Sequence, residues 1–195
     1  MNYTAIILAG GKSDRFGTDK TLLRINGELI IECIINRCKK LFAEIIIVSN
    51  ESNKFNIPGV KEISDIYPGH GPLGGIHAGL LAASNEVCFV TACDMPLFYS
   101  PLAEYILSKS NGYDIVLPKE KNNHFQPLFA VYRKNLLSQA EKLLMRKSCQ
   151  VLNLCKTANV RYIDEPDWKK RIRGNTDVFF NINSPEDYRC SRFLR

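Results

Sequence analysis

Glycines and basic residues follow the first apolar run of the sequence at a spacing that suits a ligand carrying phosphates. The segment 8–20 reads LAGGKSDRFGTDK, with Gly10 and Gly11 adjacent and Arg15 and Lys20 farther on. Glycines let the backbone approach a ligand closely and turn its N–H groups toward anions. Arg15 offers a planar fork for phosphate oxygens, and Lys20 offers a point charge. We therefore expect this loop to hold a triphosphate and to neutralise charge on a leaving pyrophosphate.

Two familiar phosphate-binding motifs do not fit this loop. A Walker A loop needs a glycine five residues before the Gly of Gly-Lys-Ser, and Ile6 stands there. A dinucleotide-binding fingerprint needs G-x-G-x-x-G, which Gly10, Gly11 and Gly17 do not match. A plain turn with solvated basic residues is the structural alternative, but turns seldom need adjacent glycines followed by a spaced Arg, Gly and Lys.

A single carboxylate, Asp94, comes just after the apolar run 87–92. Mg²⁺ prefers one or two carboxylates together with substrate phosphates, so a carboxylate at the end of a strand is well placed to bind it. The structural alternative is an Asp that caps the following turn. Taken alone, Asp94 favours neither interpretation, but the basic loop at 8–20 favours the metal ligand.

A second glycine-rich segment, GHGPLGGI, places four glycines in the seven positions 69–75 before a helix-like stretch. The start of a helix, with bare backbone amides, suits an anion or the edge of a nucleobase. Asp65 and Asn50 are candidates to contact a base or a ribose, although Asn and Asp are also common in turns. Asn181 and Asn183 lie on one face of an extended segment, which leaves room for a binding role.

Short apolar runs alternate with segments of helical spacing. We expect strands at 3–8, 44–49, 60–64, 87–92, 114–117, 128–132, 160–163 and 178–182. We expect helices at 29–42, 76–84, 102–108, 136–145 and 185–193, the last with Ser184 as N-cap. This order predicts an α/β fold with a mostly parallel sheet covered by helices on both faces. Ligands of such sheets bind outside the carboxyl ends of the strands, where the candidate residues fall.

The length of 195 residues and the 45% hydrophobic content predict one globular domain, 1–195. A net charge of +6 suits an anionic substrate, nucleic acid or simply a solvated surface. No basic stripe with interleaved aromatics is present, so we do not expect nucleic acid as a partner.

The seven cysteines contain no C-x-x-C pair, which argues against zinc ribbons and redox motifs and fits reduced thiols in the cytoplasm. The sequence shows no signal peptide and no run of transmembrane length, so we expect no membrane partner. His77 is expected within a helix, whereas the roles of His70 and His124 stay open.

The motifs LAGGKSDRFGTDK, GPLGGI, CDMP, QPLFAVY and NINSPED occur in this order, and the resemblance that they carry covers nearly the whole chain, from Ile6 to Asp187. Together they resemble the molybdenum cofactor guanylyltransferases, the MobA family. The resemblance implies a Rossmann-like nucleotidyltransferase fold, Mg²⁺ as cofactor, and transfer of GMP from GTP to the phosphate of molybdopterin with release of pyrophosphate. It also implies a monomer or weak homo-oligomer that receives molybdopterin from other molybdenum cofactor biosynthesis proteins.

The same resemblance assigns site residues by motif. The implied GTP contacts are Leu8, Ala9, Gly10, Gly11, Lys20, Asn50, Asp65 and Asp94. The implied catalytic residues are Arg15, Lys20 and Asp94, with Asp94 as metal ligand. Similar cytidylyltransferases carry Leu-Ala-Ala-Gly where this chain has Leu-Ala-Gly-Gly, which supports GTP.

The chain departs from the family at 146–149, where it reads RKSC and members commonly show a Gly-x-Arg-Ser-Leu-like pattern, so the pterin-side contacts are not assigned. The alternative functions are a nucleotidyltransferase for CTP or another phosphorylated acceptor, and a nucleotide-binding module without turnover. The presence of Arg15, Lys20 and Asp94 argues against the second alternative.

Overall fold

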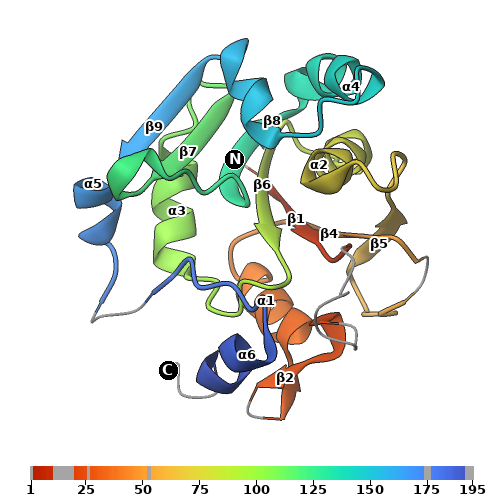
Figure 1. Ribbon diagram of the computed structural model, residues 1–195, viewed down its shortest axis with the longest axis vertical. Coiled ribbons are helices and arrows are strands. Elements are labelled where there is room, and N and C mark those ends of the chain that lie inside the picture. The colour runs from red at the N-terminus through yellow and green to blue at the C-terminus, as the bar shows by residue number, and fades with distance from the viewer. Residues whose placement is uncertain (1, 11–19, 26, 52–53, 174–176, 192–195) are drawn as a thin grey trace.

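A seven-stranded sheet forms the centre of the protein in the computed structural model, which describes residues 2–10, 20–25, 27–51, 54–173 and 177–191 (Figure 1). In sheet order its strands are β5 (Lys61–Ser64), β4 (Glu44–Ser49), β1 (Thr4–Leu8), β6 (Val87–Ala92), β8 (Phe129–Arg133), β7 (Ile115–Lys119) and β9 (Val160–Asp164). Neighbouring strands pair in parallel, except that β8 runs antiparallel to both β6 and β7. The mostly parallel sheet predicted from the sequence is confirmed.

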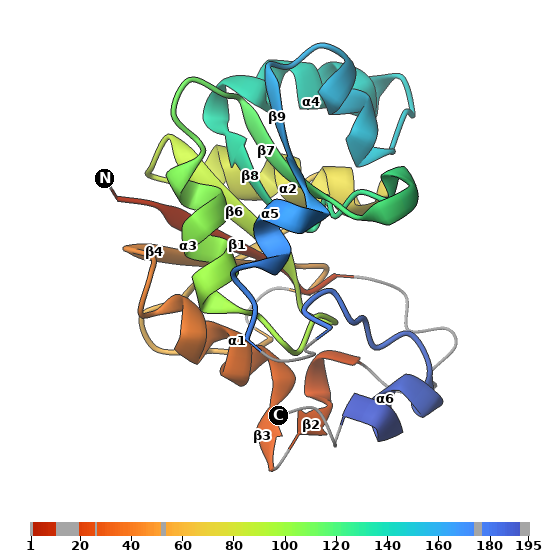
Figure 2. The same ribbon diagram turned by 90° about the vertical axis from the view of Figure 1, so that its left-hand side faces the viewer.

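Helices cover both faces of this sheet (Figure 2). On one face lie α1 (Ile30–Cys38), α3 (Ser100–Ser108) and α5 (Glu165–Lys169); on the other lie α2 (Gly71–Ala82) and α4 (Leu137–Met145). The central strand β1 is buried throughout, with Ala5 and Ile7 in one core and Ile6 in the other. A strand covered on both faces is apolar without alternation, which is why its sequence is a continuous hydrophobic run.

Smaller elements complete the fold. They are the hairpin of β2 (Arg24–Ile25) and β3 (Glu28–Leu29), the terminal helix α6 (Pro185–Ser191), and the 3-10 turns η1 (Lys20–Leu22), η2 (Lys121–Asn123), η3 (Lys134–Leu136) and η4 (Val151–Lys156). The Tyr188 hydroxyl donates to the Arg24 carbonyl over 2.6 Å and so joins α6 to the hairpin. Among the described residues, none of the helices has the length and apolar character needed to cross a bilayer.

Two glycines one helical turn apart bring α2 close to β1. A Cβ atom built on Gly79 would lie 2.5 Å from Ile6 Cγ2, and one on Gly75 would lie 3.0 Å from Leu8 Cδ2. Residues four apart share a helix face, so both glycines meet the same strand. Their small size fixes the helix against the sheet and places the start of α2 beside the end of β1.

Two expectations from the sequence were wrong. The helix expected at 76–84 begins at Gly71, because Pro72 suits the first turn of a helix and the glycines after it pack against the neighbouring loop and strand. Residues 178–182 do not form the expected strand; instead the Ile182 N–H donates to the Asp94 carbonyl over 2.9 Å. The other expected elements form, with ends that differ by a few residues.

The predicted cap of the last helix is confirmed. Ser184 Oγ accepts from the Asp187 N–H over 3.1 Å, and the Asp187 carboxylate accepts in return from the Ser184 N–H over 2.8 Å. This reciprocal pair starts α6 at Pro185, and the expected residues beyond Ser191 lie outside the described part of the chain.

Candidate active site

The carboxyl ends of β1, β4, β5 and β6 meet at one edge of the sheet, and backbone hydrogen bonds extend the pairing beyond them. The Ala9 N–H donates to Val48 O over 2.8 Å, and the Cys93 N–H donates to Leu8 O over 2.9 Å. The Asp65 N–H donates to Ser49 O over 3.1 Å. Loops that leave these strands therefore start at fixed positions along this edge, where ligands of such sheets bind.

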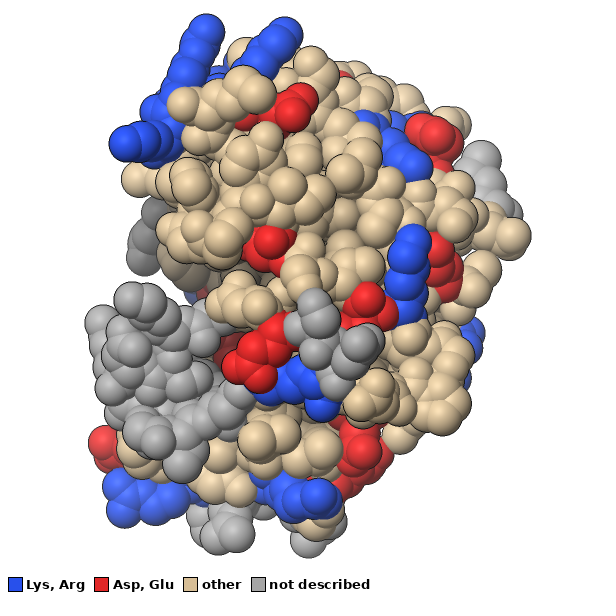
Figure 3. Space-filling view, turned by 90° about the vertical axis from the view of Figure 1, so that its right-hand side faces the viewer, with Lys and Arg blue, Asp and Glu red and all other residues tan. Residues whose placement is uncertain are grey.

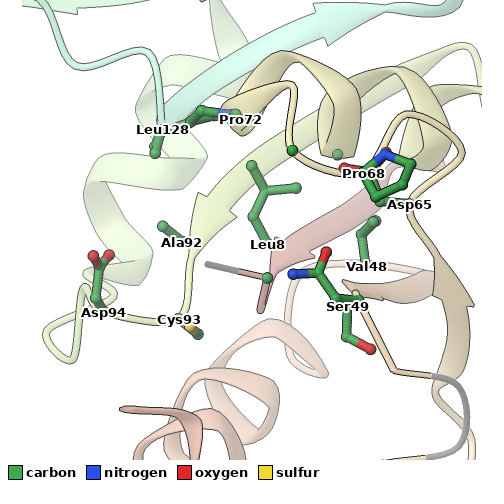
Figure 4. A pocket seen from close by; sticks show the side chains of 15 residues that line it. Leu8, Val48, Ser49, Asp65, Pro68, Pro72, Ala92, Cys93, Asp94 and Leu128 are labelled. Atoms are coloured by element: carbon green, nitrogen blue, oxygen red, sulfur yellow. The ribbon is translucent and has the colours of Figure 1, made fainter. Parts of the chain in front are cut away.

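A cavity of about 660 Å³ opens at this edge (Figure 4), within the size range of small-molecule sites. Its walls come from the ends of several strands, the start of α2 and the segment before β8. The lining residues are Leu8, Gly10, Val48, Ser49, Asn50, Asp65, Pro68, Gly69, Gly71, Pro72, Gly75, Ala92, Cys93, Asp94 and Leu128.

Five of the residues singled out from the sequence as nucleotide contacts line this cavity, namely Leu8, Gly10, Asn50, Asp65 and Asp94. Ala9 is buried and is not among the residues that line the cavity. Gly11, Arg15 and Gly17 lie outside the described residues, and Lys20 begins η1 with its side chain outside them.

Gly10 and Asn50 are close neighbours on the floor of the cavity. A Cβ atom on Gly10 would lie 3.2 Å from Asn50 Oδ1 and 3.5 Å from Asn50 Cγ. That distance is shorter than an ordinary van der Waals contact, so the Asn50 amide can occupy its position because residue 10 has no side chain.

The Asp65 carboxylate is held in place from two sides. Its Oδ1 accepts from the Tyr67 N–H over 2.8 Å, which closes a turn typical of Asp. On the other side it lies against α2, because a Cβ atom on Gly74 would be 2.9 Å from Asp65 Oδ2. The half-buried carboxylate is therefore oriented at the cavity wall before any ligand binds.

The glycines of the GHGPLGG segment have two different structural roles. Gly74 and Gly75 allow close packing against Asp65 and Leu8. Gly69 and Gly71 line the cavity and have positive φ angles of 82° and 65°, a conformation that favours glycine.

Asp94 lies at the opposite end of the cavity from Asp65 and Pro68 (Figure 4). It follows β6, and its carbonyl accepts from the Ile182 N–H over 2.9 Å, which brings the NINSPED segment to the site. Within the described ranges, no group of three or more His, Cys, Asp and Glu side chains gathers as for a protein-only metal site. A single hard carboxylate is nevertheless a donor set that suits Mg²⁺, which takes its remaining ligands from phosphates and water.

Several polar residues left open by the sequence have local roles. Asn181 Nδ2 donates to Phe179 O over 2.7 Å, and the Asn183 N–H donates to Asp187 Oδ2 over 2.9 Å. His77 lies within α2 as expected, and burial lowers the pKa of its imidazole. His70 Nδ1 lies 3.3 Å from Pro68 O, just before α2.

Sequence reasoning did not single out Ser49, Pro68, Cys93 and Leu128, all of which line the cavity. Ser49 ends β4, Cys93 follows β6, and Leu128 precedes the antiparallel β8. For Ser49 and Cys93, the position at the end of a predicted strand was a signal that the sequence offered. Leu128 required knowing that β8 runs the opposite way.

The large face of the molecule over α2, α4 and β5 carries no continuous band of basic side chains among the described residues (Figure 3). The described Lys and Arg side chains of this face lie mostly at its margins, several beside Asp or Glu (Figure 3).

Comparison with known proteins shows which family the chain is similar to. Residues 5–162 match the model of the MobA-like NTP transferase domain. A protein of Pelotomaculum thermopropionicum, named probable molybdenum cofactor guanylyltransferase, is 39% identical over 198 residues that cover 100% of this chain and 94% of that protein. A protein of Peptoclostridium acidaminophilum with the same name is 40% identical over 192 residues, covering 95% of this chain and 86% of that protein.

Solved structures are similar over nearly the whole chain. Molybdopterin-guanine dinucleotide biosynthesis protein A from Archaeoglobus fulgidus superposes with a TM-score of 0.80 at 25% identity, covering 97% of this chain and 96% of that one. A 2-C-methyl-D-erythritol 4-phosphate cytidylyltransferase from Thermus thermophilus gives a TM-score of 0.68 at 15% identity, covering 98% of each chain, and shows likeness of fold alone.

Proposed function

Because the chain belongs to the MobA-like NTP transferase family, we propose that it transfers GMP from GTP to the phosphate of molybdopterin and releases pyrophosphate. It is then a molybdenum cofactor guanylyltransferase. The observation that carries this function is the cavity at the carboxyl edge of the sheet, where Gly10, Asn50, Asp65 and Asp94 arrive from four separate loops. Residues 1–195 act as a single catalytic domain built around that one edge.

The guanosine part of GTP binds at the end of the cavity formed by Asn50 and Asp65. A carboxylate accepts only, and a guanine base presents adjacent N–H donors, so Asp65 suits the base edge. The Asn50 amide both donates and accepts. Leu8 and Val48 supply an apolar surface between these polar groups.

The phosphates extend toward Asp94. Arg15 and Lys20 neutralise the charge of the triphosphate, and Lys20 starts the turn η1 that follows the glycine loop. Asp94, together with the substrate phosphates, would hold Mg²⁺, which would supply a further positive charge there.

The reaction is an in-line displacement. An oxygen of the acceptor phosphate attacks the α-phosphorus of GTP, a new P–O bond forms, and the bond to the β-phosphate oxygen breaks as pyrophosphate leaves. The attacking phosphate is already ionised, so no residue has to remove a proton. Positioning of the two phosphates and neutralisation of their charge supply most of the rate enhancement.

We assign the enzyme to the cytoplasm, as a monomer or weak homo-oligomer that receives molybdopterin from other proteins of the same biosynthesis. None of the seven cysteines forms a disulfide in the described structure, which fits a reducing compartment.

Calorimetric titration with GTP, CTP, ATP and UTP, each with and without Mg²⁺, tests this function. We expect selective binding of GTP that strengthens with Mg²⁺, followed by pyrophosphate release once molybdopterin is added. A preference for CTP would move the assignment to a cytidylyltransferase. GTP binding without pyrophosphate release in the presence of molybdopterin would favour a binding module without turnover.

A further inference from the structure

The cavity has two ends that are lined by different residues. Asp65 and Pro68 line one end, and Asp94 and Leu128 lie toward the other (Figure 4). If the guanosine occupies the first end, the second substrate enters from the side of Asp94 and Leu128. On that side the sheet continues with β8 and β7. Neighbouring strands lie about 4.8 Å apart, so β7 is about 10 Å from β6.

A tight hairpin follows β7 at the same edge of the sheet. The Glu120 N–H donates to His124 O over 2.7 Å, and the Gln126 N–H donates to Pro118 O over 3.0 Å. An isolated antiparallel bridge joins Lys119 to Phe125 between them. In Figure 2 the η2 turn of this hairpin lies on the right-hand side, beyond the tip of β9. Two residues after Gln126 the chain reaches Leu128, which lines the cavity.

Three polar side chains meet on this hairpin. Glu120 Oε1 accepts a short hydrogen bond from Gln126 Nε2, and it lies 3.1 Å from His124 Nδ1. The Glu120 side chain keeps 32% of its surface exposed, and among the described residues nothing donates to its Oε2. Glu120 and Gln126 thus form an oriented pair with acceptor oxygens left over.

The hairpin does not need this pair for its own closure. Two backbone hydrogen bonds, donated by Glu120 and Gln126, already join its arms on either side of the bridge between Lys119 and Phe125, so the side-chain contacts add an oriented carboxylate rather than the turn itself. An oriented carboxylate beside an amide matches a ligand edge that presents adjacent N–H donors next to a carbonyl.

We propose that Glu120 and Gln126 bind the pyrimidine edge of the pterin ring of the acceptor. This inference rests on the proposed function, which supplies a pterin as the second substrate. The 2-amino group and the neighbouring ring N–H of a pterin donate to the Glu120 carboxylate, and the Gln126 amide completes the contact at the carbonyl. His124 fixes the carboxylate from its exposed side, which gives this histidine a positioning role.

A pair of fluorescent ligands tests the proposal directly. The first is 6-hydroxymethylpterin phosphate, and the second is its lumazine counterpart, in which an oxo group replaces the 2-amino group. We expect the wild-type protein to prefer the pterin. Glu120→Gln should reduce that preference about 10-fold or more, the size expected when hydrogen bonds to a charged group are lost.

Lys121→Ala is the matched control in the same hairpin, because the contact of Lys121 with Glu165 is made by its backbone N–H. This variant should keep the wild-type preference, and all variants should keep their affinity for GTP and their melting temperature. Gln126→Ala should weaken binding of the pterin without affecting GTP.

Equal affinity of the wild-type protein for the two ligands, or an unchanged preference in Glu120→Gln, would overturn the proposal. An equal loss of GTP affinity in Glu120→Gln would also overturn the proposal, since it would show that Glu120 and Gln126 maintain the fold and do not bind the pterin specifically. Pterin preference in a protein that does not bind GTP would support the pterin site and contradict the proposed function.

Discussion

The side chain of Asn50 lies where a side chain on residue 10 would have to go, since a Cβ atom on Gly10 would be 3.2 Å from Asn50 Oδ1. The two residues follow β1 and β4, whose parallel register pairs Leu8 with Val48. The sheet therefore fixes their separation, and glycine at position 10 leaves room for the amide that we assign to GTP.

Gly10→Ala should lower the affinity for GTP about five- to tenfold, the worth of roughly one hydrogen bond, because Asn50 has to turn away. Asn50 is exposed, so it can move without disturbing the core, and the melting temperature should hold. Calorimetry measures the loss. In an Asn50→Ala background the same change at Gly10 should cost nothing more, whereas additive losses would contradict crowding as the cause.

Asp94→Ala should reduce turnover by about 100-fold or more, since it removes the carboxylate that we assign to Mg²⁺ beside the phosphates. The backbone carbonyl of Asp94, which accepts from Ile182, is kept in this variant, so the protein should stay folded. Pyrophosphate release measures the effect, and circular dichroism checks the fold. Asp65→Ala serves as comparison and should weaken GTP binding instead. Normal activity in the Asp94 variant would remove Asp94 from the mechanism.

Cys93 lines the cavity, so bound GTP with Mg²⁺ should protect its thiol from alkylation. Cys190 is exposed on α6 and is not among the lining residues, so it should react equally with and without nucleotide. Mass spectrometry of the labelled peptides reads both sites in one sample. Labelling of Cys93 that ignores GTP would place the nucleotide elsewhere.

Asp114 should stabilise the fold in a pH-dependent way. Asn135 Nδ2 donates to its carboxylate over 2.6 Å and the Asn159 N–H donates over 2.9 Å, and these bonds lower the pKa of Asp114 below its ordinary value. The stabilisation is therefore full above the pKa of the unfolded chain and is lost as the pH falls through the lower folded pKa.

Asp114→Asn should accordingly reduce the free energy of unfolding by about 1 kcal/mol at neutral pH. The difference from wild type should shrink as the pH falls. Urea titrations across the acid range measure it, with Glu104→Gln on the exposed side of α3 as the control. A difference that stayed constant with pH would show that the charge of Asp114 does not matter.

The sequence predicted the layers of the fold because continuous apolar strands and helical spacing follow from burial alone. Its errors have local causes. The helix start at Gly71 was missed because glycines usually oppose helix formation, and here close packing against β1 and Asp65 outweighs that preference. The apolar stretch at 178–182 looks like a strand, but Val178 and Ile182 are buried in the core without a strand partner in the sheet.

The lining of the cavity was predictable where residues come within two positions of the end of a parallel strand, as Gly10, Asn50 and Asp94 do. What could not be predicted is which of them touch, since the contact between Gly10 and Asn50 depends on the register of β1 against β4. The Glu120 and Gln126 pair depends on a hairpin turn whose geometry includes Asn123 at a φ of 60°. The spacing of apolar residues in the sequence contains no information about the geometry of such a turn.

Because β8 runs antiparallel to its neighbours, the segments that line the two sides of the cavity come from different parts of the sequence. The loops after β1, β4 and β5 serve one half, and the connection that runs from β7 into β8 serves the other. If residues 119–128 bind the acceptor as we propose, a relative that carries a different loop there should use a different acceptor while its residues on the side of Asp65 stay the same. On this assignment the choice of acceptor depends on one replaceable segment, whereas the choice of nucleotide depends on several loops together.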